Sequence, residues 1–189
     1  MAHIRCPDPV LLIVAAFSKQ VEVLEDAGRR LEEILGPIAF ASLAYAFTHT
    51  DYYETTMGRY LQKLFLVFQN LVPAESLALI KNQTNEIESA VAQSGAFAEP
   101  RPINLDPGIL TLGKFMLATT KDQAHRIYLR DGIYAEVTLR FEAGAYHPWP
   151  WTYADYRQPC VAAFMKEARS FYRCRLLERK GHDSAEAGG

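Results

Sequence analysis

The chain has 189 residues, of which 49% are hydrophobic and 22% charged, and its formal net charge is −2. This composition is typical of a globular domain, and the near-neutral charge argues against a nucleic-acid partner or a charged membrane surface. The three cysteines lie far apart and include no C-x-x-C pair, so we expect no disulfide framework, no thiolate metal site and a reducing, cytoplasmic location. No apolar run is long enough to span a membrane.

The first third of the chain predicts two strands and a helix. Residues 1–9 contain two prolines and are expected to form an irregular lead-in. The uninterrupted apolar run over residues 10–17 predicts a buried strand, and the apolar spacing over about 19–35 predicts an amphipathic helix. A second strand is expected over residues 38–47, and the polar and aromatic residues 48–60 are expected to form a long loop.

The middle of the chain is expected to add two more strands and two helices. Residues 63–68 predict a third strand, and the helix over residues 73–93 begins with a proline at its first position. Residues 103–105 predict a short strand that ends at the turn Asp106-Pro107-Gly108. A short helix is then expected over residues 110–118.

The clearest pattern is a β-hairpin that joins residues 126–130 to residues 133–141. A three-residue loop with a left-handed Gly132 gathers the apolar side chains of both strands on one face, so we expect it in place of a two-residue loop. In this register Arg126 lies opposite Glu136. The other expected pairs are Ile127 with Ala135, Tyr128 with Tyr134, and Leu129 with Ile133.

The chain is expected to end in a helix and a tail. Pro159 opens the last helix, whose inward positions are expected to be Cys160, Phe164, Ala168, Phe171 and Cys174. Residues 179–189 are expected to form a flexible tail, which leaves residues 10–178 as one domain. The order β-α-β-β-α-β, followed by a short helix, a hairpin and a helix, predicts an α+β domain with a ferredoxin-like core.

Two short motifs resemble nucleotide-binding sequences. Residues 108–115 fit the phosphate-loop pattern G-x4-G-K, which makes Lys114 a candidate phosphate ligand. Phe115 replaces the Ser or Thr that would hold magnesium, and the loop residues are bulky, so an ordinary helix start with a solvated Lys114 is the stronger interpretation. Residues 120–122 resemble the guanine-reading Thr-Lys-x-Asp motif, but the aspartate comes one residue too early.

Polar residues gather at the ends of the predicted strands. Asn104 and Asp106 follow the fourth strand, His125 and Arg126 begin the hairpin, and Glu136 lies opposite Arg126. Together they can hold an anion through Asn104 and Arg126, with His125, Glu136 and Asp106 as candidate acid–base residues. Taken singly, these residues also fit a cross-strand ion pair and a turn. No histidine pair has metal-ligand spacing, so no metal site is expected.

Two loops, residues 50–54 and 147–156, are rich in aromatic side chains. Such side chains either cover the edges of a core or form the walls of a ligand pocket. The pocket alternative involves Tyr52, Tyr53, Trp151 and Tyr153, with Asp51 and Asp155 as polar contacts.

Several strings are specific in combination. They are FTHTDYYE at 47–54, NLDPG at 104–108, ATTKD at 118–122, HRIYL at 125–129, DGIYAEVTL at 131–139 and WTYADY at 151–156. With them the sequence resembles, over about residues 10–175, a bacterial family called domain of unknown function 4416. Many members are labelled "GTP-binding protein", so the resemblance implies GTP binding as one candidate function, but it implies no established activity.

These observations favour a cytosolic domain that binds, or also acts on, an anionic small molecule or nucleotide. Two alternatives stay open. One is a non-catalytic module for protein interaction or self-association through the aromatic loops, and the other is a GTP-binding protein. The sequence specifies no cofactor.

Overall fold

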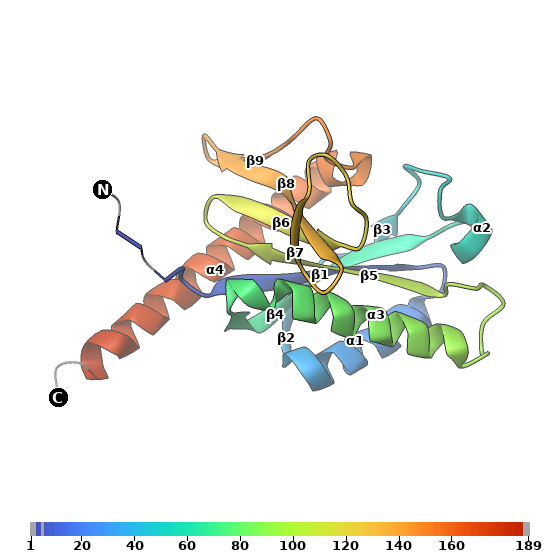
Figure 1. Cartoon of the computed structure of the whole chain (residues 1–189), viewed down its shortest axis with the longest axis horizontal. Helices are drawn as coiled ribbons and strands as arrows, with labels where there is room; N and C mark the ends of the chain where they lie inside the picture. The colour runs from blue at the N-terminus through green and yellow to red at the C-terminus, as the bar shows by residue number, and fades with distance from the viewer. Residues whose placement is uncertain (1–2, 5, 187–189) are drawn as a thin grey trace.

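The computed structural model describes residues 3–4 and 6–186, with side chains described as far as Gly181. In this part of the chain the strands form one nine-stranded sheet in the order β2-β4-β1-β5-β6-β8-β7, with β3 paired to β4 and β9 paired to β8 (Figure 1). The paired strands are antiparallel. The predicted α+β class is confirmed, because helices accompany an antiparallel sheet.

The strands are β1 (Val10–Ser18), β2 (Ile38–Ala41), β3 (Tyr45–Ala46), β4 (Gln62–Val72), β5 (Ile103–Leu110), β6 (Lys114–Thr119), β7 (Ile127–Arg130), β8 (Ile133–Glu142) and β9 (Ala145–Pro148). The α-helices are α1 (Val21–Leu35), α2 (Glu54–Met57), α3 (Leu77–Gln93) and α4 (Pro159–Glu186). The short 3-10 helices η1 (Ala74–Ser76) and η2 (Ala154–Arg157) precede α3 and α4.

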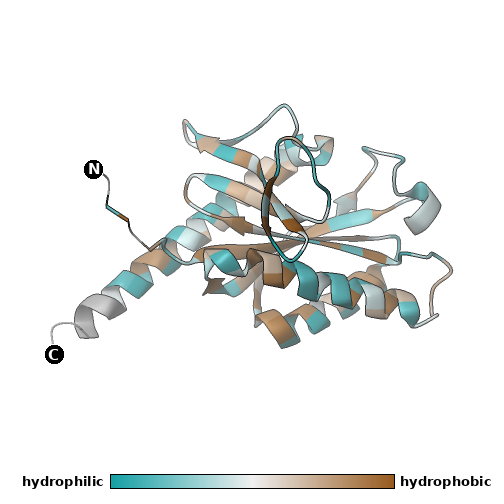
Figure 2. Ribbon diagram, in the orientation of Figure 1, coloured by the Kyte–Doolittle hydropathy of each residue, from teal (hydrophilic) through white to brown (hydrophobic). Residues whose placement is uncertain are grey.

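Helices cover both faces of the sheet. Helices α1 and α3 pack on one face, where Leu12, Val14 and Ala16 of β1 are buried, and α4 packs on the other face over Leu11 and Ile13. β1 is therefore buried along its whole length, which explains its uninterrupted apolar sequence. Figure 2 shows hydrophobic residues concentrated on the strands between the helical layers. No helix in the described part of the chain has both the length and the hydrophobicity needed to cross a membrane.

The first part of the chain follows the predicted order with two differences. The strand expected over residues 38–47 is divided into β2 and β3, because the Ser42 hydroxyl takes the place of a backbone carbonyl and accepts the N–H of Phe65 (2.9 Å). The loop expected over residues 48–60 contains the single-turn helix α2. β1, α1 and α3 are confirmed, and β4 extends beyond its predicted end to Val72.

The turn expected at Asp106-Pro107-Gly108 and the helix expected over residues 110–118 are wrong. β5 continues through all three turn residues, and β6 occupies the place of the helix. A Cβ at Gly108 would lie 2.5 Å from the Phe115 ring, so glycine is needed here because β6 packs closely against β5. The chain turns at Thr111–Gly113, where the Thr111 N–H donates to the Lys114 carbonyl (2.8 Å).

The predicted hairpin is formed by β7 and β8, but its loop is shorter than expected. Asp131 and Gly132 both have positive φ (53° and 76°), which makes a two-residue loop. Ile127 pairs with Ala135 and Tyr128 with Tyr134, as predicted, whereas Ile133 pairs with Arg130 in place of Leu129, across an irregularity in β7.

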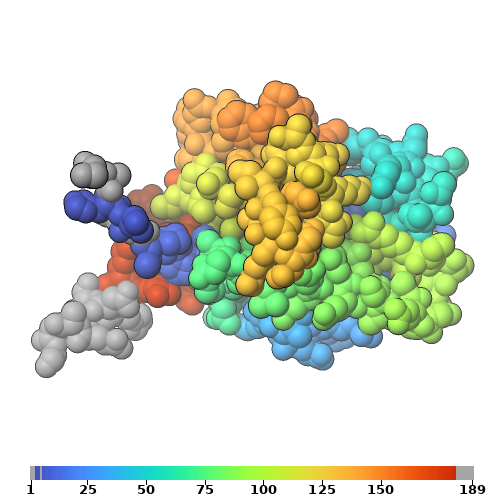
Figure 3. Space-filling view, viewed as in Figure 1, coloured from blue at the N-terminus to red at the C-terminus, as the bar shows by residue number. Residues whose placement is uncertain are grey.

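β7 lies at the edge of the sheet, and the hairpin lies over the molecular surface beside α3 (Figures 1 and 3). The two apolar β7 residues on the face expected to be buried are open to solvent, because Ile127 is 72% exposed and Leu129 40% exposed. Ile133, at the start of β8, is buried. The prediction that the apolar side chains of both strands share one face therefore gave two cross-strand pairs correctly and gave the pair next to the loop wrongly.

Helix α4 buries a stripe one position away from the predicted one. Phe164 and Ala168 are buried as expected, but Cys160 and Cys174 are exposed. The buried stripe consists of Val161, Phe164, Met165, Ala168, Tyr172 and Leu176. The helix continues to Glu186, into the range expected to be a tail, and residues 187–189 lie outside the described residues.

Candidate functional site

A cavity of about 410 Å³ opens where β5 and β6 separate. β5 pairs with β1 along its whole length, but it pairs with β6 only from Gly108 to Leu110. The first half of β5 therefore has an edge that β6 does not cover, and Asn104 and Asp106 of that half line the cavity. The segment 47–53, the end of β6 and η2 also contribute to the wall. The volume falls within the usual range for small-molecule sites.

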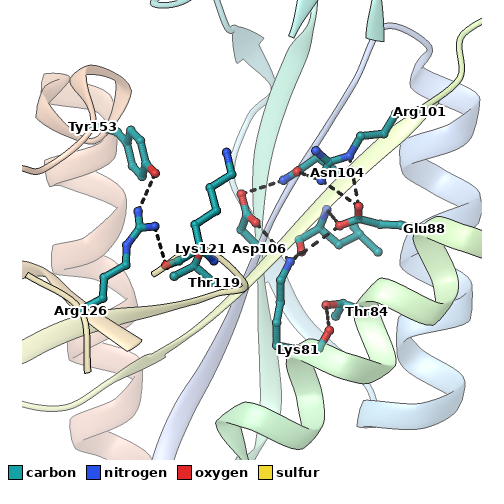
Figure 4. Close-up of polar contacts among 11 residues, drawn as sticks. Lys81, Thr84, Glu88, Arg101, Asn104, Asp106, Thr119, Lys121, Arg126 and Tyr153 are labelled. Carbon is teal, nitrogen blue, oxygen red and sulfur yellow. Dashed lines mark hydrogen bonds and ion pairs between the residues drawn. The ribbon is translucent and has the colours of Figure 1, made fainter. Parts of the chain in front are cut away.

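Side chains of α3 make the hydrogen bonds that a neighbouring strand would make with β5. The Leu105 N–H donates to Glu88 Oε1 (2.7 Å), and Lys81 Nζ donates to the Leu105 carbonyl (2.7 Å). Buried backbone groups need such partners, and these contacts satisfy the N–H and the carbonyl of Leu105 where β5 is not paired with β6. Arg101 holds Glu88 from another side (2.8 Å; Figure 4). Burial raises the pKa of Glu88, and the charges of Lys81 and Arg101 oppose this rise.

The carboxylate of Asp106 is partly open to the cavity. One oxygen accepts a hydrogen bond from Asn104 Nδ2 (2.7 Å), the other accepts one from Lys81 Nζ (3.3 Å), and the side chain is 30% exposed. Burial acts to raise the pKa of Asp106, but Lys81, Lys63 and the bond from Asn104 outweigh it and hold the pKa below its ordinary value. An ionised carboxylate has about four acceptor positions, so Asp106 keeps capacity for a bound molecule.

Arg126 and Arg101 lie on opposite sides of Asp106, and hydrogen bonds hold Arg126 in place (Figure 4). Its Nε donates to Glu136 (2.8 Å), and its terminal nitrogens donate to the Lys121 carbonyl (3.0 Å) and the Tyr153 hydroxyl (2.8 Å). The side chains of Arg126 and Glu136 are 1% and 2% exposed. Burial acts to lower the pKa of Arg126, but the hydrogen bonds and charges of Glu136 and Tyr153 together outweigh it and raise the pKa, so the guanidinium stays charged.

A second buried ion pair lies deeper in the cavity. Lys63 Nζ donates to Asp155 Oδ2 at 2.5 Å, and both side chains are almost fully buried. The same ammonium lies 4.4 Å from the centre of the Tyr156 ring and within 5.6 Å of the rings of Phe17, Phe47 and Phe65. Aromatic faces and one carboxylate thus replace water around a buried cation.

One cation at the cavity has no carboxylate partner. Among the described residues that line the cavity, Lys63, Lys81, Arg101 and Arg126 each form an ion pair with Asp155, Asp106, Glu88 and Glu136, respectively. Lys121 forms none with the described side chains, and its ammonium contacts the hydroxyl of Tyr52 (3.0 Å). This bond, and the positive charge behind it, lower the pKa of Tyr52. The cavity therefore has one surplus positive charge, at an exposed lysine.

The structure brings seven of the ten residues singled out in the sequence to this one cavity. They are Asn104, Asp106, Arg126, Glu136, Tyr52, Tyr53 and Tyr153. The other three, His125, Trp151 and Lys114, do not line it. Asp155, which the sequence suggested as a polar contact, is part of the lining, whereas Asp51 is exposed outside it.

The three residues outside the cavity have other surroundings. His125 contacts Glu136 (3.2 Å) from outside and stacks on Trp151, with the ring centres 5.3 Å apart. Trp151 in turn stacks on Trp149 and donates its N–H to the Val137 carbonyl (3.1 Å), so this loop packs on itself and on β8. Lys114 is exposed at the start of β6, in a hairpin, which is not the strand-loop-helix context of a phosphate loop.

Sequence reasoning missed the lysines Lys63, Lys81 and Lys121 and the pair Arg101–Glu88. A signal existed for α3, because Lys81, Thr84 and Glu88 recur at helical spacing and form a polar stripe beside the apolar face. Lys63 is the first residue of an apolar run and looked like an ordinary strand end.

No three histidine, cysteine, aspartate or glutamate side chains come together as a metal-binding group in the described ranges. Apart from Lys121, the lysines and arginines of the cavity lining are instead paired with carboxylates.

A family model matches residues 8–172, and its description is Domain of unknown function (DUF4416). The chain belongs to this family. The match covers every residue of the cavity lining and confirms the resemblance seen in the sequence. No curated protein and no solved structure matches the chain.

Proposed function

We propose that this member of the family binds a small anionic molecule in the cavity between β5 and β6. The observation that carries the proposal is the surplus charge of Lys121, beside a cavity in which every other lysine and arginine of the lining has a carboxylate partner. An anionic group at Lys121 neutralises a charge that the protein leaves unmatched. Arg126 lies next to it, because its guanidinium bonds to the Lys121 carbonyl, and it uses three of its five N–H donors in the contacts above.

Aromatic residues make up much of the rest of the wall. Tyr52 and Tyr153 are 64% and 48% exposed beside Lys121 and Arg126, while the partly buried Tyr53 packs against the buried rings of Phe47 and Phe17. This combination of apolar walls and a few fixed polar groups is the usual composition of a small-molecule site.

Asp106 is the residue we propose for proton transfer if the bound molecule is also a substrate. Its carboxylate is ionised, partly exposed and oriented by Asn104 and Lys81, so it can accept a proton from a bound molecule, although its lowered pKa makes it a weak general base. Glu136 is a weaker candidate, because Arg126, His125 and Thr138 already occupy its oxygens.

The experiment that tests binding is a thermal-shift screen followed by calorimetry. The panel contains inorganic phosphate, sugar phosphates, small carboxylates, and ATP and GTP with and without magnesium. We expect at least one anion to raise the melting temperature by several degrees, and Lys121→Glu to weaken its binding by about tenfold or more.

Lys114→Glu is the matched control, because Lys114 is an exposed lysine at the start of β6, outside the cavity, whereas Lys121 follows the end of the same strand. The affinity of the Lys114→Glu variant for the anion should stay within about twofold of that of the unmodified protein. A panel without any stabilising anion, or equal losses in the two variants, contradicts the proposal. A large shift with GTP that depends on Lys121 favours the nucleotide version of the proposal.

A second candidate is self-association or protein interaction, as the sequence suggested. The aromatic loop around Trp151 packs on the protein itself, but β7 at the edge of the sheet leaves Ile127, Tyr128 and Leu129 between 40% and 72% exposed. Exposed apolar edge strands are places where other chains pair. Light scattering discriminates between the candidates, because a monomer across the micromolar range opposes self-association.

We also propose that β1, α1, β2, β4, α3 and β5 form a ferredoxin-like unit and that the protein is cytoplasmic. The order β2-β4-β1-β5 with α1 and α3 on one face supports the first. Three free, exposed cysteines support the second. Backbone contacts between β1 and both neighbours in an NMR experiment, and cell fractionation, test them.

A further inference from the structure

The cavity changes in character from its exposed side to its buried side. Tyr52, Tyr153 and Lys121 are exposed at the mouth, whereas Lys63, Asp155 and Tyr156 are each 3% exposed and form the floor. The floor has no surplus charge, because Lys63 and Asp155 are paired at 2.5 Å. The positive charge of Lys121 at the mouth therefore matches an anionic group, and the floor is suited to the uncharged part of the same molecule.

The hydroxyl of Tyr156 is the unusual group of the floor. It is buried and has no hydrogen-bond partner among the described residues, although Tyr156 lines the cavity. Burial raises the pKa of this hydroxyl, and the charge of Asp155 raises it further, so the hydroxyl keeps its proton and can donate a hydrogen bond. Buried hydroxyls are normally hydrogen-bonded, so this unpartnered one gains a partner when a bound molecule displaces the atoms that cover it.

Asp106 complements this donor. Its carboxylate accepts one hydrogen bond at each oxygen from protein groups and has further acceptor positions. Because Lys81 already balances its charge, Asp106 offers an ammonium group no unmatched negative charge. A neutral hydroxyl suits it better, since a hydroxyl donates to a carboxylate and accepts from a phenol at the same time.

From these observations we infer that the anion is a polyhydroxylated one, such as a sugar phosphate, whose hydroxyls are bound by Tyr156 and Asp106. This inference rests on the proposed function, because it assumes that Lys121 holds the anionic group. The rings of Phe17, Phe47 and Tyr53 then lie against the C–H surface of the sugar.

The test compares ligands of equal charge with and without hydroxyls. Ribose 5-phosphate and glucose 6-phosphate are titrated by calorimetry beside propyl phosphate, which has the ester phosphate and no hydroxyl. We expect at least one sugar phosphate to bind about tenfold more tightly than propyl phosphate, which corresponds to about one well-formed hydrogen bond. Equal affinities, or tighter binding of propyl phosphate, overturn the inference.

Tyr156→Phe separates binding from folding. It keeps the ring in the core and removes a hydroxyl that has no partner in the described structure, so the melting temperature should stay equal or rise while the preference for the sugar phosphate falls about tenfold. Tyr45→Phe is the matched control, because its hydroxyl is also buried without a described partner and lies outside the lining. It should leave the preference unchanged.

The two proposals fail in different ways. If Lys121→Glu weakens both kinds of ligand while sugar and propyl phosphate bind alike, the anion site stands and the hydroxyl inference is wrong. An unchanged preference in Tyr156→Phe also overturns the inference. If none of the three phosphate esters binds, the inference is wrong and the wider panel of anions decides on the anion site. If Lys121→Glu weakens none of the anions that bind, the anion site itself is wrong and the inference falls with it.

Discussion

Asp106 keeps its charge in a wall of the cavity because Lys81 and Asn104 bind the ionised form. Its pKa is therefore below the ordinary value of 3.8 in the folded protein, despite the opposing effect of burial. A group with a depressed folded-state pKa contributes stability above its ordinary pKa, and this contribution is lost as the pH falls toward the folded-state pKa. The stability of the protein should thus include an Asp106-dependent part that disappears in acid.

We predict that Asp106→Asn is less stable than the unmodified protein near neutral pH and that the difference shrinks below about pH 4. The variant cannot titrate at this position, so it lacks the acid-dependent loss that Asp106 contributes. Urea denaturation of both proteins between about pH 7 and about pH 2.5 measures the difference. A difference that stays constant down to the lowest pH, or grows there, contradicts a depressed pKa.

The residues of the cavity show how far sequence reasoning reaches at this scale. Arg126 and Glu136 were placed together correctly, because strand register fixes which residues face each other and one hairpin contains both. Lys81 belongs to a helix far away in sequence from Leu105 and Asp106, and no local pattern links the two segments. A buried lysine on an amphipathic helix was therefore missed, although its spacing from Thr84 and Glu88 was visible.

The β5–β6 hairpin shows tertiary packing overriding a local turn signal. Asp-Pro-Gly is a strong turn sequence, yet Val14 of β1 pairs opposite Pro107, and Ile109 and Leu110 are buried within the sheet. Pairing on one side with β1 keeps the chain extended until it reaches Thr111. Gly108 is then required by the close approach of Phe115 and the Met116 carbonyl, since its φ is not in the left-handed range.

We predict that Gly108→Ala costs about 1–3 kcal/mol of unfolding free energy, because its Cβ would lie 2.5 Å from a Phe115 ring atom and 2.7 Å from the Met116 carbonyl oxygen. Gly113→Ala, in the loop of the same hairpin, has no atom within 4 Å of its added Cβ and should change stability by about 0.5 kcal/mol or less. Urea denaturation of the two variants compares them directly. Equal effects would mean that β6 does not pack on β5 as described.

At the scale of the whole molecule, the order of the elements was more predictable than the cavity they enclose. Hydrophobic periodicity predicted the buried β1 and its neighbours α1 and α3, because a helix or strand must bury its apolar face whatever it packs on. The cavity depends on where β5 and β6 stop pairing, and this follows from how α3 side chains replace a strand at Leu105. That replacement depends on the assembled fold. The sequence therefore indicated the cavity residues on β5 and β8, but it did not indicate that β5 and β6 separate to form the cavity.

The segment that leads into β1 contacts α4, which extends beyond the sheet (Figure 1). The Tyr172 hydroxyl donates to the Pro9 carbonyl (2.8 Å), and Leu176, one turn further along α4, is 7% exposed. The family match stops at residue 172, before this last buried leucine. The packing on the α4 face thus continues past the end of the matched region, to Leu176.

We therefore predict that a chain ended after residue 180 has the stability of the full-length protein to within about 0.5 kcal/mol, since it retains every buried side chain in the described part of α4. A chain ended after residue 172 should lose about 2–4 kcal/mol, because it removes Leu176 and frays the turn that carries Tyr172. Urea denaturation of the three proteins at one pH gives the comparison. If the chain ended at residue 172 is as stable as the full-length protein, Leu176 contributes no burial energy and the core on this face ends with Tyr172. If the chain ended at residue 180 loses as much stability as the shorter one, the last turns of α4 make contacts that stabilise the fold.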